Sequence, residues 1–268
     1  MICNKYDLLE KIGQGTFSQI YKGRNIRTGE LVAIKIEPKT AEIKLLQNET
    51  RMYQYLHSFN KSQIPEIKWF GVDTENYYMV ISLLGKSLES FKREQPNGRA
   101  YLFDTLHLGI KMIHILESIH KRLLIHRDIK PDNFLFGLES SLHDAEPIHL
   151  IDFGFCTKYR SHFTPTKTSN IIGTPKFASI SAHEFNELSR RDDLESVGYI
   201  LIYLYMGELA WDKITDNDEI KLMKLQMIHG EDTSIPRVFI DYLRNVRNIA
   251  FYETPNYAKL ISRFSGKQ

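Results

Sequence analysis

The sequence predicts an α+β fold of two lobes, a small β-rich N-terminal lobe with one main helix and a larger α-helical C-terminal lobe. Up to about residue 83, short runs of β-branched and aromatic residues alternate with glycine-containing turns, which is typical of strands. From about residue 104, apolar residues recur at the spacing of helices that bury one side. We therefore expect a single domain over residues 1–268, with an N-lobe at about 1–82, a C-lobe at about 86–268 and a ligand-binding cleft between them.

The individual elements follow from the same patterns. The expected strands are Tyr6–Gly13, Phe17–Gly23, Leu31–Glu37, Glu66–Gly71 and Tyr77–Leu83. The expected helices are 40–57 in the first lobe and 104–123, 191–207, 218–229 and 236–248 in the second. The most apolar run, Val197–Met206, is too short to cross a bilayer and is predicted to be a buried helix.

Composition narrows the possible partners and location. The chain of 268 residues has a formal net charge of +2, which gives no electrostatic argument for binding nucleic acid or a membrane. Its two cysteines, Cys3 and Cys156, lie far apart and indicate a reducing compartment rather than a disulfide framework. The first residues, MICNKYDLLEKIG, contain no apolar stretch long enough for a signal peptide. We expect a protein of the cytoplasm, the nucleus or both, and among oligomeric states a monomer is favoured.

The stretch HRDIKPDNFLF at 126–136 places charged and amide side chains inside an apolar run. Because buried charge is costly unless it is paired or bound, this stretch needs a partner. Asp128 is placed to accept a proton from a substrate hydroxyl, and Lys130 to neutralise a phosphoryl group during transfer. Asn133 offers a neutral oxygen to a metal ion.

A second motif, IDFG at 151–154, follows the apolar strand IHLI. Asp152 is a hard oxygen ligand suited to Mg²⁺, and Gly154 permits the sharp turn that aims it. Either motif alone is compatible with an ordinary polar loop. Together, in this order and about twenty residues apart, they predict a magnesium-dependent phosphoryl-transfer site.

Two motifs of the first lobe are weaker when taken alone. In IGQGTFSQI at 12–20, Gly13 and Gly15 let the backbone approach phosphates, although a plain glycine hairpin has the same pattern. A strand follows this turn where a dinucleotide-binding turn needs a helix. In VAIK at 32–35, Lys35 is either a cation for phosphate oxygens, with Glu49 as its counter-charge, or an edge-strand lysine that reaches solvent.

These motifs, in this order, resemble a eukaryotic-type protein kinase over essentially the whole chain. Lys130 together with Gly173 and Thr174 is similar to the serine/threonine class. The segments LLGKSLE at 83–89, GTPKFASISAH at 173–183 and SRRDDLESVGYILIYLYMGELAW at 189–211 resemble the casein kinase 1 family.

The resemblance implies the protein kinase fold, ATP and Mg²⁺ as cofactors, and the serine or threonine hydroxyls of proteins as substrates. It implies Asp128 and Lys130 as catalytic residues, Asn133 and Asp152 as metal ligands, and Thr174 and Lys176 as substrate-binding residues. The residues implied to bind ATP are Ile12, Gly13, Gln14, Gly15, Thr16, Phe17, Ser18, Gln19, Ile20, Ala33, Lys35, Glu49, Leu84 and Leu135, with Ala33 and Leu135 sandwiching the adenine ring and Leu84 contacting it through its backbone.

The chain departs from the pattern of its relatives at Ser18, at Lys176 and in the segment 212–221. Ser18 stands where most kinases have a third glycine, so the loop tip is expected to be slightly stiffer. Lys176 replaces an arginine of the family's phosphate pocket, and DKITDNDEIK at 212–221 is acidic where the family is basic, although Lys213, Lys221 and Lys224 lie nearby. Like charge repels phosphate, so we expect a weakened preference for substrates that already carry a phosphate.

The sequence leaves open the role of Asp193 and some alternatives for the class of protein. Asp193 either caps the helix that begins near it or holds the backbone of the catalytic loop. A pseudokinase scaffold usually lacks the lysine, the catalytic aspartate or the metal aspartate, and all three are present here. A small-molecule kinase commonly lacks the lysine at position 130. Metal binding by His114, His120 and His126 is disfavoured because a spacing of six residues does not place them on one helical face.

Overall fold

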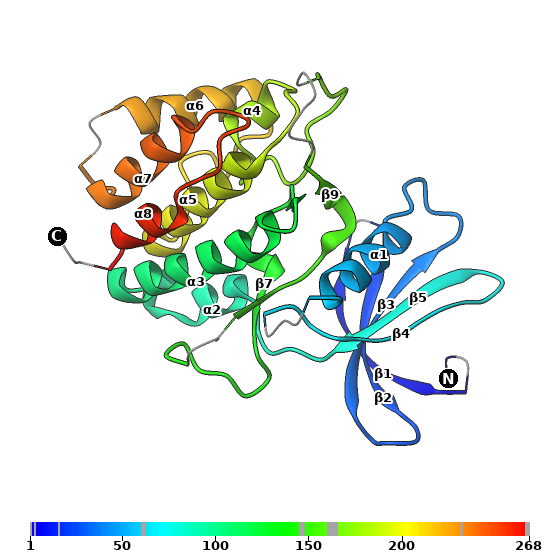
Figure 1. Ribbon diagram of the computed structural model, residues 1–268. Helices are drawn as coiled ribbons and strands as arrows, with labels where there is room; N and C mark the ends of the chain where they lie inside the picture. Colours follow the sequence, from blue (N-terminus) through cyan, green and yellow to red (C-terminus); the bar gives the residue numbers. More distant parts are fainter. Residues whose placement is uncertain are drawn as a thin grey trace. The chain divides into compact units, whose positions relative to one another are not determined.

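The computed structural model describes residues 2, 4–15, 17–59, 63–144, 148–159, 166–230 and 233–265. It divides into two compact units (Figure 1). The first unit comprises Met1–Lys86 and Leu135–Phe155, and the second comprises Ser87–Phe134 and Cys156–Gln268. The first is β-rich and the second helical, as the sequence predicts. The segment Leu135–Phe155, which the sequence analysis placed in the second lobe, groups with the first unit.

A five-stranded antiparallel sheet forms the body of the first unit, in the order β1-β2-β3-β5-β4. Each predicted strand is present, and no end differs from the prediction by more than two residues. One face of the sheet packs as an apolar core that includes Val32, Ile34 and Val80. The strands are β1 (Tyr6–Gln14), β2 (Gln19–Asn25), β3 (Leu31–Pro38), β4 (Ile67–Val72) and β5 (Asn76–Ser82).

The α-helix described in the first unit, α1, spans Leu46–His57. It begins six residues later than the sequence predicts, and the cause is a contact from β3. The buried Glu37 accepts hydrogen bonds from the backbone N–H groups of Leu45 and Leu46, at 2.9 and 3.0 Å. Since no side chain at the helix start caps these donors, the carboxylate of β3 fixes where α1 begins.

The later part of the first unit contains strands β7 (Phe134–Phe136) and β8 (Ile148–Leu150), which pair, and the 3-10 helix η3 (Phe153–Phe155). The Gly85 N–H donates to the Phe136 carbonyl at 2.8 Å, and the Phe136 N–H donates to the Lys86 carbonyl at 2.9 Å. These bonds tie the segment after β5 to β7.

The second unit is built mainly of helices around α5, whose contacts include α3 and α7 (Figure 1). The four helices predicted from the sequence are α3, α5, α6 and α7, and α2, α4 and α8 are additional. The helices are α2 (Leu88–Glu94), α3 (Leu102–His120), α4 (Ile180–His183), α5 (Arg190–Met206), α6 (Asn217–His229), α7 (Arg237–Arg247) and α8 (Tyr257–Ser262). The other elements are η1 (Pro96–Gly98), β6 (Leu124–Ile125), η2 (Pro131–Asn133) and β9 (Thr157–Lys158), with β6 paired to β9.

Helix α5 is buried on most of its surface, as predicted for its apolar run. A capping box of Ser189 and Asp192 starts it, and Gly207 ends it with a left-handed φ of 88°. Over the described residues, no helix combines the length and apolar character needed to cross a membrane.

Candidate active site

In the first unit, the structure brings together Lys35 of β3, Glu49 of α1 and Asp152. The Lys35 Nζ lies 2.7 Å from Glu49 Oε2 and 2.9 Å from Asp152 Oδ1. The lysine side chain is 15% exposed, so it does not reach out into solvent as an edge-strand lysine would. A cation between two carboxylates, one of them fully buried, is suited to hold phosphate oxygens beside a metal ion.

The charges of this cluster depend on one another. Burial by itself lowers the pKa of Lys35, but the carboxylates of Asp152 and Glu49 outweigh burial and raise it above the ordinary lysine value. Burial also raises the pKa of Glu49 to about 7, and the ammonium of Lys35 opposes that rise. Lys35 is therefore a permanent cation at physiological pH.

Helix α1 also supports the segment that carries Asp152. Tyr53, one turn after Glu49, packs edge-on against Phe153 with ring centroids 5.0 Å apart. The Asn48 amide donates to the Gly154 carbonyl at 2.9 Å. Asn48 and Tyr53 are not among the residues predicted from the sequence, although Tyr53 stands four residues after Glu49, the spacing that places side chains on one helical face.

The glycine-containing motif is the turn of the β1–β2 hairpin, with Gly13 opposite Ile20. The Gly15 N–H donates to the Ser18 carbonyl at 2.8 Å, and a Cβ on Gly15 would lie 2.9 Å from the Ser18 hydroxyl. The turn is thus a glycine hairpin, and the same hairpin is the loop whose backbone is predicted to approach phosphates. Ser18 is buried, Phe17 is half-buried, and the exposed positions of the motif are Ile12, Gln14 and Gln19; Thr16 lies outside the described residues.

The three residues assigned to the adenine ring belong to adjoining strands of the first unit. Ala33 pairs with Ile81 across β3 and β5. Leu84 precedes Gly85, which is hydrogen-bonded to β7, and Leu135 lies in β7. All three are half-buried rather than fully enclosed, so apolar surface remains available on each.

In the second unit, the structure brings together Asp128, Lys130 and Thr174. Asp128 is 4% exposed. Its Oδ2 lies 2.8 Å from the Lys130 Nζ, and its Oδ1 accepts from the Thr174 N–H and hydroxyl at 2.9 and 2.8 Å. Lys130 also donates to the Thr174 hydroxyl at 3.3 Å. The Asn133 amide also donates to Oδ2 at 3.5 Å, so this network of donors fixes the orientation of the carboxylate.

Gly173 is required by this arrangement. Its φ is 91°, and a Cβ there would lie 2.4 Å from the Arg127 carbonyl. Any other residue would push the backbone of Thr174 away from Asp128.

Each of the two side chains implied as metal ligands has, by its chemistry, an oxygen suited to the metal ion that the sequence implies. The Asn133 amide nitrogen donates to the Asp128 carbonyl at 2.9 Å, which leaves its oxygen as the group offered to a cation. Asp152 adds a carboxylate in the other unit. Both are hard oxygen donors of the kind Mg²⁺ prefers. In the described part of the chain, no group of three His, Cys, Asp or Glu side chains forms a separate metal site.

The two possibilities for Asp193 are now resolved. Its carboxylate accepts from the backbone N–H groups of His126 and Arg127, at 2.7 and 2.8 Å, and lies 3.0 Å from His120 Nε2. Burial raises the pKa of Asp193, but these hydrogen bonds outweigh burial and lower it overall. Asp193 thus holds the backbone that leads into Asp128, and at the start of α5 it is Asp192 whose carboxylate accepts from the Ser189 N–H, at 2.7 Å.

Lys176 is engaged by its own surroundings. Its Nζ lies 2.9 Å from Asp212 Oδ2 and 3.9 Å from the centroid of the Tyr203 ring. Lys176, which the resemblance implies as a substrate-binding residue, is therefore paired with Asp212, one of the acidic residues expected to weaken phosphate binding.

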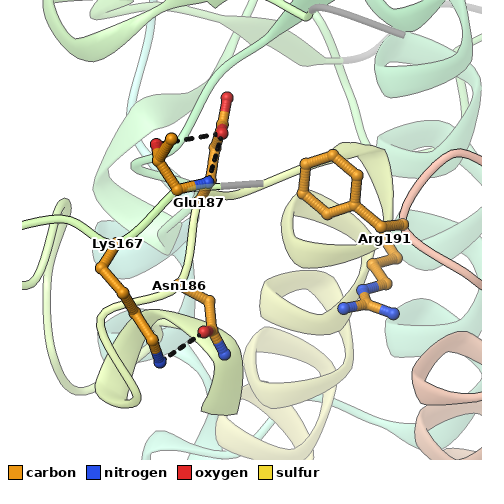
Figure 2. Close-up of a pocket in the computed structure, with 6 residues that line it drawn as sticks. Lys167, Asn186, Glu187 and Arg191 are labelled. Atoms are coloured by element: carbon orange, nitrogen blue, oxygen red, sulfur yellow. Dashed lines mark hydrogen bonds between the residues drawn. The ribbon is translucent and has the colours of Figure 1, made fainter. Parts of the chain in front are cut away.

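The second unit also has a pocket of about 270 Å³ (Figure 2). Figure 2 shows Lys167 and Asn186, joined by a 2.7 Å hydrogen bond, across the opening from Arg191. None of its lining residues is among those predicted for catalysis or binding, and the chemistry is therefore assigned to the Lys35 and Asp128 clusters. The lining residues are Thr166, Lys167, Asn186, Glu187, Arg191 and Phe251.

Fold and site together define an enzyme class. A β-rich unit with a carboxylate-paired lysine, and a helical unit with a lysine-paired aspartate, are the parts of a phosphotransferase. The protein kinase domain family matches residues 6–260, so the chain belongs to that family. It is similar to the solved structure of vaccinia related kinase 3, with a TM-score of 0.82 and 20% identity, covering 97% of this chain and 85% of that chain. The protein kinase fold predicted from the sequence is thus confirmed.

Proposed function

We propose that this protein is an ATP-dependent serine/threonine protein kinase similar to casein kinase 1, formed by one kinase domain over residues 1–268. The observation that carries the proposal is the direct contact of Asp128 with both Lys130 and Thr174. A lysine and a threonine on the catalytic aspartate are what the resemblance to the serine/threonine class implies.

Each member of the two clusters has a proposed role. Lys35, held by Glu49, orients the phosphates of ATP beneath the Gly13–Ser18 turn. Asp128 orients the substrate hydroxyl and accepts its proton, while Lys130 neutralises charge on the phosphoryl group. Positioning and charge stabilisation do most of this catalysis, because phosphoryl transfer asks little covalent chemistry of the protein.

Magnesium is proposed to bind through Asp152 and Asn133. Bound Mg²⁺ neutralises phosphate charge and aligns the nucleotide. The contacts of the two ligands support this role: Lys35 limits the negative charge around Asp152, and Asp128 fixes the orientation of the Asn133 amide.

A weakened preference for phosphate-bearing substrates is proposed from the state of the basic residues near Asp212. Lys176 is paired with Asp212, Lys221 is paired with Asp218 at 2.8 Å, and Lys224 is fully buried. A substrate phosphate would have to displace a carboxylate from Lys176 before it could bind there.

The test is phosphate transfer by the purified protein with Mg²⁺ and labelled ATP, using casein, a tyrosine-containing polymer and small alcohols as acceptors. We expect label on casein, as phosphoserine or phosphothreonine. Label on tyrosine or on the small alcohols alone would reject the substrate class. Nucleotide binding with no transfer to any acceptor would identify a pseudokinase.

A further inference from the structure

Lys224 of α6 is the most deeply buried cation described in this chain, with 0% of its surface exposed. Its Nζ donates to the carbonyls of Pro175 and Ala178 at 2.8 and 2.7 Å, and it lies 3.0 Å from His183 Nε2. In the sequence it resembles a surface lysine of an amphipathic helix. Its position four residues from both Ile220 and Ile228, which are buried, is the signal that it points inward.

The surroundings of this ammonium are aromatic and contain no paired acid. The rings of Tyr199 and Trp211 lie 4.7 and 5.4 Å from its Nζ. Among the described residues, none supplies a carboxylate oxygen within ion-pair distance of it. Burial lowers the pKa of Lys224 to about 7, and the charge of Glu195 opposes that change. The two carbonyls and the His183 ring nitrogen take the place of water at its Nζ.

Both carbonyls belong to one short segment, residues 174–178, which is neither strand nor helix. A second side chain from outside the segment holds it, because Trp211 Nε1 donates to the Lys176 carbonyl at 2.9 Å. Within the segment, the N–H groups of Phe177 and Ala178 both donate to the Thr174 carbonyl at 2.9 Å. Lys224 of α6 thus fixes the carbonyls of Pro175 and Ala178, and Trp211, which follows α5, fixes the carbonyl of Lys176.

The first residue of this segment is the one that contacts the catalytic aspartate. Thr174 bonds to Asp128 through its N–H and its hydroxyl. A continuous set of hydrogen bonds therefore runs from Lys224 through the 174–178 backbone to Asp128.

We propose that Lys224 is a positioning residue for phosphotransfer, which fixes the 174–178 backbone and, through Thr174, the carboxylate of Asp128. The lysine binds the protein's own carbonyls and not an anion of the substrate. This inference rests on the proposed function, since it concerns how the protein substrate and Asp128 are held for reaction.

The test compares Lys224→Met with Lys259→Met, which removes an exposed lysine from α8. Lys224→Met is expected to lower kcat/KM for a casein-derived peptide by about tenfold or more, while the Kd for ATP changes by less than about twofold. Lys259→Met is expected to keep both values near wild type. A loss of ATP affinity equal to the loss of peptide turnover would show general damage and overturn the proposal.

A second variant covers the case in which Lys224→Met does not fold, as judged by circular dichroism. Trp211→Phe removes the bond to the Lys176 carbonyl and makes the ring beside Lys224 smaller, and it is expected to show the same peptide-specific loss, of about threefold or more. Wild-type peptide kinetics in either folded variant would reject the positioning role. If the wild-type protein itself transfers no phosphate to casein, the proposed function fails, and that result is separate from the outcome for Lys224.

Discussion

The hydroxyl of Thr174 donates a 2.8 Å hydrogen bond to Oδ1 of Asp128, across 46 positions of sequence. The backbone N–H of Thr174 reaches the same oxygen, so the carboxylate is held at one end by Thr174 and at the other by Lys130. Asp128, the proposed catalytic aspartate, is thus oriented by residues of its own unit.

Asp128→Asn is expected to lower kcat for casein by about 100-fold or more, because an amide cannot accept the hydroxyl proton. The Kd for ATP is expected to stay near wild type, since Asp128 is not among the residues assigned to the nucleotide. Labelled-phosphate transfer and equilibrium nucleotide binding measure the two effects. Asp241→Asn, at an aspartate of α7 whose side chain is 38% exposed, serves as the matched control. A near-normal rate in Asp128→Asn would remove Asp128 from its role.

Lys35→Met is expected to weaken MgATP binding by at least about tenfold and to lower the free energy of unfolding by about 3 kcal/mol, because it leaves buried Glu49 without its cation. Lys22→Met removes the exposed partner of Glu10 on the adjacent strand, and its effect on unfolding should stay within about 1 kcal/mol. Urea denaturation and calorimetric titration with MgATP test both variants. Equal destabilisation by the two substitutions would contradict the assignment of Lys35 as a buried, doubly paired cation.

Asp212→Asn is expected to release Lys176 and to raise kcat/KM for a peptide with an upstream phosphate by about fivefold, through a restored charge attraction. The unphosphorylated peptide should be turned over as before. Glu219→Gln removes the same charge from an exposed position on α6 and should change neither value. If both variants improve the phosphopeptide equally, net charge rather than the Lys176–Asp212 pair controls the preference.

The pH dependence of stability is expected to include a contribution from His183. Burial and the neighbouring Lys224 lower its pKa from 6.5 to about 4. Between these values only the unfolded state takes up the proton, so stability that is complete above pH 6.5 is lost as the pH falls, by at most about 1.4 kcal/mol per pH unit. His183→Gln should flatten this part of the curve in urea denaturation, whereas His114→Gln, at an exposed position, should not. An unchanged slope in His183→Gln would show that the histidine is already protonated in the folded state.

Cys156 is expected to resist alkylation while the protein is folded. It is 2% exposed, and burial raises the pKa of its thiol to about 12, so little thiolate exists at pH 8. In a Cys3→Ser background, iodoacetamide should modify the folded protein about 100-fold more slowly than the urea-unfolded protein. Comparable rates would mean that the thiol is reachable in the native state.

The sequence predicts the strands of the first unit well because each carries its own alternation of side chains and its own turn. The start of α1 is predicted poorly because Glu37, a residue of β3, caps it. Helix α2 is missed because seven residues, introduced by the Ser87 cap, are too few to show a helical period. The two-residue strands β6 and β9 exist only through pairing across the fold.

The residues of the candidate site also differ in how well the sequence predicts them. Motif order locates Lys35, Asp128 and Asp152, because the chemistry demands particular residue types at each position. The proposed role of Lys224 cannot be predicted from a sequence motif, because it depends on backbone carbonyl groups, which every residue has. Only the folded path of residues 174–178 shows which carbonyls the lysine meets.

The grouping of Leu135–Phe155 with the first unit has a consequence for how the protein is made and cut. Lys35 is synthesised 117 residues before Asp152, so its ion pair with Asp152 can form only after the later segment has been made. A fragment that stops at Lys86 contains Glu49 but lacks both Asp152 and the ring of Phe153 that Tyr53 packs against. Anyone who wishes to express the small unit alone must therefore splice residues 135–155 back onto it.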